Sequence, residues 1–225
     1  MNTKKLILAL TLCVIMVAVL FVYDGGLLTS FRQEDLYGSW VTDVPAAQRV
    51  EQSLAQFGIT YDIADDLMMT YEFRYNEDGT VTVSVEGESA KELAAVQVEA
   101  LREGLPEMLY EQYLTEANMD RAATDAMLAA QGLTMESLVE ISLSQIDFEA
   151  QYTSASMSVT QHYCVKDGRV CYAASAVDLA NGCYDMSVEA ERKGDTLILS
   201  NAVDKDGNAF EGNGVVKYPL TLKRK

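Results

Sequence analysis

Three cysteines and the only histidine lie within residues 162–183, and these are the residue types best suited to chemistry in this chain. Asp167-Gly168 predicts a two-residue hairpin turn, which places Cys164 opposite Cys171. Cross-strand neighbours have Cβ atoms about 4.5–5.5 Å apart, within reach of a disulfide. We therefore predict a Cys164–Cys171 disulfide, unless a three-residue bulged turn shifts the register. Cys183 follows on the next strand and is expected to be free or to pair with another chain.

A zinc site is the main alternative for the same residues. His162 and Cys164 share one face of a strand, but the whole set lacks the paired Cys-x2-Cys knuckle of structural zinc sites. A catalytic His162–Cys164 pair would also lie on an outward face, without a cleft or a third orienting group. We interpret His162 as a surface histidine and predict no metal and no cofactor.

The remaining polar motifs have simple structural interpretations. Residues 204–208 resemble a calcium loop, but Gly207 is the fourth residue where the EF-hand pattern needs glycine sixth, so we expect a plain turn. Asp65 and Asp66 are expected on a solvated face. No Gly-rich phosphate loop and no serine–histidine–acid order is present in the sequence. We therefore predict that the protein is not an enzyme and has no catalytic residues.

Residues 69–85 have the pattern of a β-hairpin. Aromatic and β-branched residues alternate with polar ones on both sides of Asp78-Gly79, and period-two alternation around Asp-Gly is a strong hairpin signal. One face must therefore be buried in a sheet with a core. The side chains expected on that face are Met69, Tyr71, Phe73, Tyr75, Val81, Val83 and Val85.

Similar alternation recurs along the chain and predicts a mainly β fold. A first strand is expected at residues 36–43, and the later ones at 154–165, 169–176, 184–191, 196–201 and 216–222. Consecutive short strands joined by tight turns are typical of an up-and-down barrel. We predict about eight antiparallel strands in a barrel or half-barrel, an α+β fold once its helices are counted.

Helical periodicity interrupts this pattern twice. A short helix is expected from about Val44-Pro45 to Gly58, because proline suits a first turn and glycine a helix end. A helical insertion is expected at about residues 89–147. Within it, Gly104 and Pro106 should break the first helix. Asn118 and Thr134 should then act as the N-caps of two further helices.

The N-terminus predicts a membrane anchor. Lys4 and Lys5 precede an uncharged apolar run at residues 6–23 that is long enough to span a bilayer as a helix. Small residues suited to signal-peptidase cleavage are missing, which favours an uncleaved signal anchor over a cleaved signal or a lipid on Cys13. The positive-inside rule then places the rest of the chain outside the cell. We expect residues 1–23 to form the anchor, 24–35 a tether and 36–225 the folded domain.

The amino-acid composition and the net charge of the chain exclude some classes of binding partner. The chain of 225 residues is 49% hydrophobic, which excludes wholesale disorder, and it carries a net charge of −17. Such a surface repels nucleic acid and anionic headgroups. We therefore expect no nucleic-acid partner, and a membrane association that depends on the N-terminal helix.

Four stretches resemble lipocalin-like domains of uncharacterised, membrane-anchored proteins of the bacterial cell envelope. They are Gly38-Ser-Trp40, Tyr71-Glu-Phe-Arg-Tyr-Asn-Glu-Asp-Gly79, Gly194-Asp-Thr-Leu-Ile-Leu199 and Tyr218-Pro-Leu-Thr-Leu-Lys-Arg224. The resemblance spans about residues 36–224. It implies a barrel in which Trp40 packs with a late arginine, here Arg224, and it implies binding in a general sense.

Two functions are consistent with these predictions. One is a structural or protein-interaction module of the cell envelope that is displayed outside the membrane and uses its helices as the contact surface. The alternative is the binding of a small apolar ligand or lipid, in the barrel or at its junction with the helices. The expected pocket lining is Met69, Tyr71, Phe73, Val81, Val83, Val159 and Tyr163.

Overall fold

The computed structural model describes residues 31–212 and 216–225, in which eight strands form a closed antiparallel barrel. The barrel runs in sequence order and closes where β8 pairs with β1. The predicted antiparallel barrel of about eight strands with a helical insertion is therefore confirmed, but the chain is not mainly β, because its described helices contain more residues than its strands. Its strands are β1 (Gly38–Pro45), β2 (Met68–Tyr75), β3 (Thr80–Val85), β4 (Val159–Lys166), β5 (Arg169–Ala173), β6 (Met186–Lys193), β7 (Thr196–Asp204) and β8 (Leu220–Arg224).

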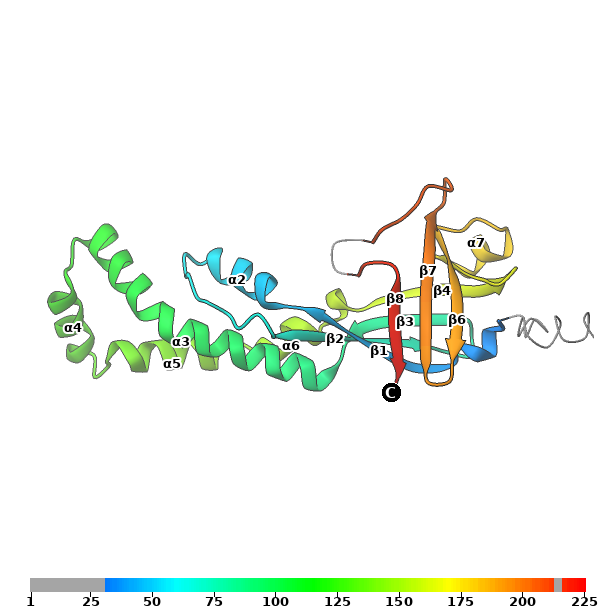
Figure 1. Cartoon of the computed structure of the whole chain (residues 1–225). Coiled ribbons are helices and arrows are strands. Elements are labelled where there is room, and N and C mark those ends of the chain that lie inside the picture. The colour runs from blue at the N-terminus through cyan, green and yellow to red at the C-terminus, as the bar shows by residue number, and fades with distance from the viewer. Residues whose placement is uncertain (1–30, 213–215) are drawn as a thin grey trace, which may run out of the picture.

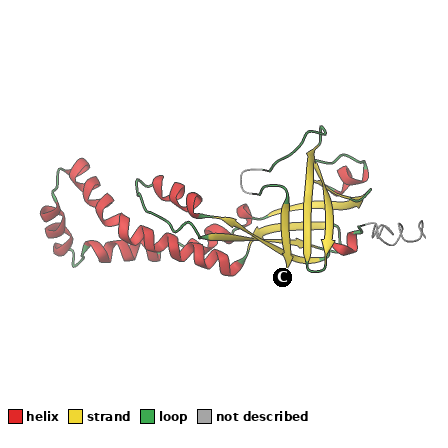
Figure 2. Cartoon of the chain, viewed as in Figure 1, coloured by secondary structure: helices red, strands yellow, loops and turns green. Residues whose placement is uncertain are grey.

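The helices within residues 47–55 and 87–153 lie at one end of the barrel and extend away from it, whereas the short helix at residues 176–180 lies at the other side, against the barrel (Figures 1 and 2). α2 (Ala47–Ala55) follows β1, and the helical insertion leaves from β3 and returns to β4. We call the insertion the helical arm; it consists of α3 (Gly87–Ala117), α4 (Arg121–Ala130), α5 (Met135–Ser144) and α6 (Phe148–Thr153). Two short 3-10 helices, η1 (Gln33–Asp35) and η2 (Ala155–Met157), and the short helix α7 (Ala176–Ala180) complete the described elements.

The β2–β3 hairpin follows the predicted alternation. Phe73 pairs with Val83, and Tyr75 pairs with Val81. The aromatic side chains of β2 and the valine side chains of β3 therefore lie on the same side of the sheet. Their side chains point into the barrel because inward positions recur every second residue. The register of β4 and β5 is also as expected, with Cys164 directly opposite Cys171. Asp167 and Gly168 both have positive φ, which suits the tight two-residue turn.

The predicted break at Gly104 and Pro106 is wrong, because α3 continues through both residues. Leu101 is buried and Leu105 and Leu109 pack against the core, so tertiary contacts hold the helix together across the missing backbone donor. Gly104 serves another purpose: a Cβ there would collide with Ile59, so glycine allows the chain after α2 to approach α3 closely.

Several predicted boundaries also change. Asn118 is a left-handed C-cap of α3, and Asp120 caps α4 instead, accepting from Ala123 N. Thr134 caps α5 as expected. Val44 and Pro45 belong to β1, so the next helix begins later, at Ala47.

Further differences lie around the later strands. β4 starts only at Val159, and the closing strand starts at Leu220, both later than the alternation suggested. α7 was not predicted, because so short a helix leaves little periodicity in the sequence.

One end of the barrel interior is closed by large side chains. Trp40 is fully buried, and its indole N–H donates to Leu36 O over 2.6 Å. The guanidinium carbons of Arg192 and Arg224 lie 5.6 and 5.8 Å from the Trp40 ring centre. The expected contact between Trp40 and Arg224 is therefore confirmed, and Arg192 adds a second cation that was not foreseen.

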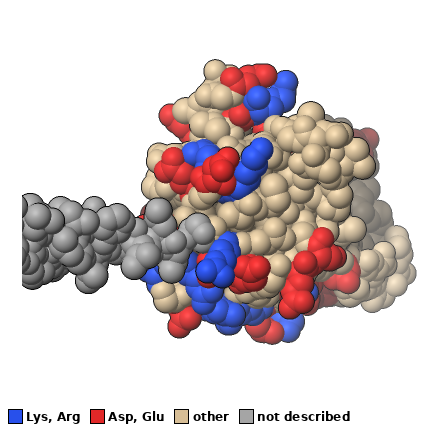
Figure 3. Space-filling view, turned by 90° about the vertical axis from the view of Figure 1, so that its right-hand side faces the viewer, with Lys and Arg blue, Asp and Glu red and all other residues tan. Residues whose placement is uncertain are grey.

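The predicted membrane anchor at residues 1–23, Cys13 included, lies outside the described residues, as does most of the tether. Among the residues that are described, no helix is both long and apolar enough to cross a bilayer. Figure 3 views the end of the molecule opposite the helical arm, where acidic and basic side chains are interspersed around an area of uncharged residues.

Candidate functional site

The barrel is filled at one level and hollow at another. Tyr75, Tyr163 and Tyr172 fill the closed part: the Tyr75 and Tyr172 hydroxyls are 2.7 Å apart, and the Tyr163 hydroxyl donates to Asn76 O over 2.9 Å. The rings of Tyr75 and Tyr163 meet edge to face, 5.0 Å between centres. Burial raises the pKa of all three tyrosines. The three tyrosines are therefore neutral core residues. Each hydroxyl already has a hydrogen-bond partner within the protein, so none is left to bind a ligand.

A cavity of about 530 Å³ lies beside this filled part. Cavities of this size commonly accommodate small molecules. Its lining comes from strands β2, β3, β4, β6 and β7, from α2 and η2, from the residue before β6 and from residues between β7 and β8. The lining residues are Arg49, Tyr71, Phe73, Val83, Met157, Val159, Gln161, Asp185, Met186, Asp204, Phe210, Val216 and Tyr218.

Four of the seven predicted pocket residues line this cavity: Tyr71, Phe73, Val83 and Val159. The other three do not. Met69, Val81 and Tyr163 are almost completely buried and belong to the packed core. The cause is depth along the barrel axis, because residues on one inward face can lie at a filled level or at a hollow level.

The sequence did not predict most of the other residues that line the cavity. Gln161 and Met157 share the two-residue period of Val159, so alternation alone would have included them. Phe210 and Tyr218 lie outside regular strands, where no periodicity marks an inward side chain. Their rings are tilted against each other with centres 6.2 Å apart, and they cover one side of the cavity.

Tyr218 and Met186 form a mixed polar and apolar part of the wall. The Tyr218 hydroxyl donates to the Met186 sulfur over 3.8 Å, a weak hydrogen bond that a better acceptor would replace. Burial raises the pKa of Tyr218 to about 12, so its hydroxyl remains a donor at physiological pH. The adaptable thioether of Met186 suits an apolar ligand of variable shape.

Three charged residues line the cavity, and they differ in how far they are satisfied. The Arg49 guanidinium donates to the Tyr71 hydroxyl over 3.2 Å and has no carboxylate partner within 4 Å among the described residues. The Asp185 carboxylate accepts from Ala174 N. The Asp204 carboxylate accepts hydrogen bonds from the backbone and the side chain of Asn208, within the turn that follows β7. These hydrogen bonds lower the pKa of Asp204. Arg49 is therefore the charge most available to a ligand.

The thiols of Cys164 and Cys171 face each other on the outside of the barrel, and both are free in the structure. Burial raises the pKa of Cys164, and burial together with the adjacent Cys164 sulfur raises that of Cys171 to about 11. The disulfide itself stays a prediction. Cys183 is exposed and free. No group of three or more potential metal ligands occurs in the part of the chain that the structure describes.

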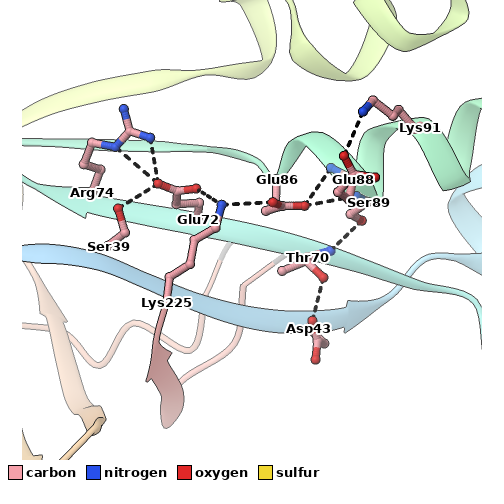
Figure 4. A network of polar contacts seen from close by, with 10 residues as sticks. All are labelled: Ser39, Asp43, Thr70, Glu72, Arg74, Glu86, Glu88, Ser89, Lys91 and Lys225. Carbon is pink, nitrogen blue, oxygen red and sulfur yellow. Dashed lines mark hydrogen bonds and ion pairs between the residues drawn. The ribbon is translucent and has the colours of Figure 1, made fainter.

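A polar network on the outer face of β2 fastens the C-terminus to the barrel (Figure 4). The Glu72 carboxylate accepts from Ser39, Arg74 and Lys225, each over 2.8 Å. Burial raises the pKa of Glu72, but these hydrogen bonds outweigh it and lower the pKa to about 2. Lys225, the residue after β8, also donates to Glu86, the N-cap of α3, so the network connects the end of β8 with β2 and with the start of the helical arm. The charged groups of the network are hydrogen-bonded to one another, so we interpret the network as structural and not as a binding site.

Comparison with known protein families, with curated proteins and with solved structures finds no match to this chain. The candidate site therefore rests on its own geometry.

Proposed function

We propose that the barrel binds a small, mainly apolar ligand in its cavity. The observation that carries this proposal is the cavity of about 530 Å³ inside a barrel whose remaining interior is densely packed. The hollow opens to solvent, and Val159 in its lining is 56% exposed, so a ligand that covers such side chains removes apolar surface from water. Tyr71, Phe73 and Phe210 offer aromatic faces to such a ligand, and Gln161 and Tyr218 offer hydrogen bonds.

The proposed role is binding without catalysis. The charged groups of the cavity are one arginine and two aspartates, and the described lining has no nucleophile held beside a base. Because the apolar run at residues 6–23 follows two lysines, we also propose that the chain is anchored in the cell membrane with its barrel outside the cell. Protease treatment of intact cells, which should degrade the barrel and spare the N-terminus, tests this placement.

Ligand binding is tested with the full-length chain in nanodiscs of zwitterionic lipid. The probe is N-phenyl-1-naphthylamine, an uncharged dye that becomes fluorescent in apolar surroundings, and dodecanol is the competitor. Saturable binding with one site per chain is expected, beyond the uptake by empty nanodiscs. The substitution Val83→Phe should weaken it about tenfold or more by filling the cavity, while Thr82→Phe, on the outer face of the same strand, should not. Equal binding by both variants, or uptake no greater than that of empty nanodiscs, contradicts the proposal.

The helical arm supports a second function, contact with a protein partner. The arm extends from the barrel (Figure 1), and it exposes large apolar side chains that include Leu114, Ile141 and Ile146. Such side chains on a projecting element favour an interaction surface. Photo-crosslinking from the arm in intact cells tests this function, and a complete lack of arm-dependent crosslinks would contradict it.

A further inference from the structure

A second hollow lies between α2 and the helical arm, away from the barrel cavity. It has a volume of about 300 Å³ and is lined by residues of α2, α3, α5 and α6 and the segments that follow α2 and α5. Leu101, Leu143 and Phe148 are buried at its base. Phe57 and Ile146 line it while remaining 54% and 48% exposed. We call this hollow the arm groove.

The residues that line the groove are uncharged, but the helical arm that forms most of its walls is strongly acidic, and this charge restricts what can occupy the groove. The helical arm contains 13 acidic and 3 basic residues, a net charge of −10 out of −17 for the whole chain. All three basic residues are already paired within the arm. Lys91 pairs with Glu88, Arg102 with both Glu99 and Glu140, and Arg121 with Glu107. Nine acidic residues of the arm therefore have no cationic partner within 4 Å among the described residues.

The negative charge of the arm repels some of the possible binding partners of the groove and attracts others. A second copy of the chain would bring another arm of charge −10 and would be repelled. Nucleic acid and anionic lipid are repelled for the same reason. A basic partner is attracted, and its apolar side chains find a place between Phe57 and Ile146. An amphipathic helix with one apolar and one basic face offers apolar side chains to the groove and cations to the acidic arm beside it.

We propose that the arm groove binds a basic amphipathic helix of a partner protein. The inference rests on the proposed function of the arm as a protein-contact surface, and it adds the class of partner. The apolar face of the partner helix inserts between α2 and α5–α6, and its lysines or arginines meet the unpaired carboxylates of the arm. Binding should therefore be tighter at low salt, since exposed charges are screened as ionic strength rises.

The test uses the full-length chain in nanodiscs of zwitterionic lipid and fluorescently labelled synthetic peptides, followed by fluorescence anisotropy. One peptide is an amphipathic helix of leucine and lysine. Two others keep the same leucines and replace every lysine by glutamine or by glutamate. Saturable binding is expected for the lysine peptide beyond its binding to empty nanodiscs, weaker binding for the glutamine peptide and none for the glutamate peptide.

Matched variants locate the binding. Ile146→Gln, at the groove, should weaken the binding of the lysine peptide about tenfold, because the loss of an apolar contact of this size lowers the affinity by about that factor. Ile141→Gln, on α5 but outside the groove and 45% exposed, should have little effect. Glu103→Gln with Glu111→Gln on the arm should weaken binding and reduce its salt dependence. The same number of charges removed from the rest of the chain, by Glu34→Gln with Glu77→Gln, should not.

The outcomes separate the inference from the function on which it rests. If the glutamine peptide binds as tightly as the lysine peptide and Ile146→Gln weakens both, the arm is a contact surface but the basic class of partner is wrong. If no peptide binds beyond empty nanodiscs, or if both isoleucine variants behave alike, the groove is not a docking site. Self-association of the chain that Ile146→Gln abolishes would assign the groove to a second copy and overturn the proposal.

Discussion

The Lys225 ammonium lies 2.8 Å from the Glu72 carboxylate, so the last residue of the chain is fastened to the outer face of β2 (Figure 4). Glu86, at the start of α3, accepts from the same ammonium over 2.9 Å. The backbone of Lys225 donates to Ser39 O as well. One terminal residue thus connects barrel closure with the base of the helical arm.

The first prediction concerns acid stability. The pKa of Glu72 falls from an ordinary value of 4.5 to about 2 in the folded chain. Between these values the unfolded chain binds more protons, so the free energy of unfolding decreases as pH falls from about 4.5 to 2. Glu72→Gln should remove about 1–2 kcal/mol at pH 7, allowing for screening because Arg74 and Lys225 are partly exposed. Denaturant titrations at several pH values measure it.

The control for that prediction is Glu77→Gln, an exposed carboxylate in the β2–β3 turn. It should leave the acid dependence unchanged. If Glu72→Gln loses stability in parallel with the wild-type chain down to pH 2, the network does not hold Glu72 ionised.

The second prediction concerns close packing at α3. Gly104→Ala should destabilise the fold by about 1–3 kcal/mol, because the new Cβ collides with the side chain of Ile59, which is buried. Gly87→Ala, at the first residue of the same helix, meets no atom within 4 Å and should be neutral or slightly stabilising. Thermal unfolding of the two variants measures the difference. Equal melting temperatures would show that Ile59 moves aside without cost.

The third prediction concerns the thiols. Cys183 is exposed, while Cys171 is buried and its pKa is about 11. Iodoacetamide at neutral pH should therefore modify Cys183 well before Cys171, as peptide mass mapping would show. Mild oxidation of the Cys183→Ser chain should then join Cys164 and Cys171, faster as pH rises. The melting temperature should increase only slightly, because the disulfide closes a very short loop. Modification of Cys171 ahead of Cys183 contradicts the burial.

The fourth prediction concerns ligand choice. Arg49 lines the barrel cavity without an ion-pair partner in the described chain. Dodecanoate should displace the naphthyl dye more effectively than dodecanol, by roughly fivefold to tenfold, since a charge-assisted contact adds about 1 kcal/mol or more. Arg49→Gln should abolish that preference and leave dodecanol unaffected. Equal competition by both compounds in the wild-type chain would show that Arg49 does not face the ligand.

Sequence periodicity and turn residues were sufficient at the two tight hairpins, β2–β3 and β4–β5. The alternation around Asp78-Gly79 placed Tyr71 and Phe73 on the inner face, and Asp167-Gly168 set the pairing of Cys164 with Cys171. Turn chemistry and a two-residue period are local properties, and they transfer directly from sequence to structure.

Helix continuity was not decided locally. Gly104 and Pro106 are both unfavourable inside a helix, yet α3 passes through them. Packing of Leu101 and Leu105, together with the close approach of Ile59, outweighs those preferences.

The sequence alone predicted short antiparallel strands in a barrel or half-barrel, a helical insertion and a strongly acidic composition, whereas the closure of the barrel through β8 and β1 is seen only in the structure. Only the tertiary structure decided which inward side chains line the cavity and which are packed in the core. Tyr163 and Val159 share one face of β4, but Tyr163 closes the core while Val159 lines the cavity. The reason is that depth along the barrel axis depends on strand stagger and closure, which involve every strand at once. For the same reason, Phe210 and Tyr218 enter the cavity wall from outside regular strands.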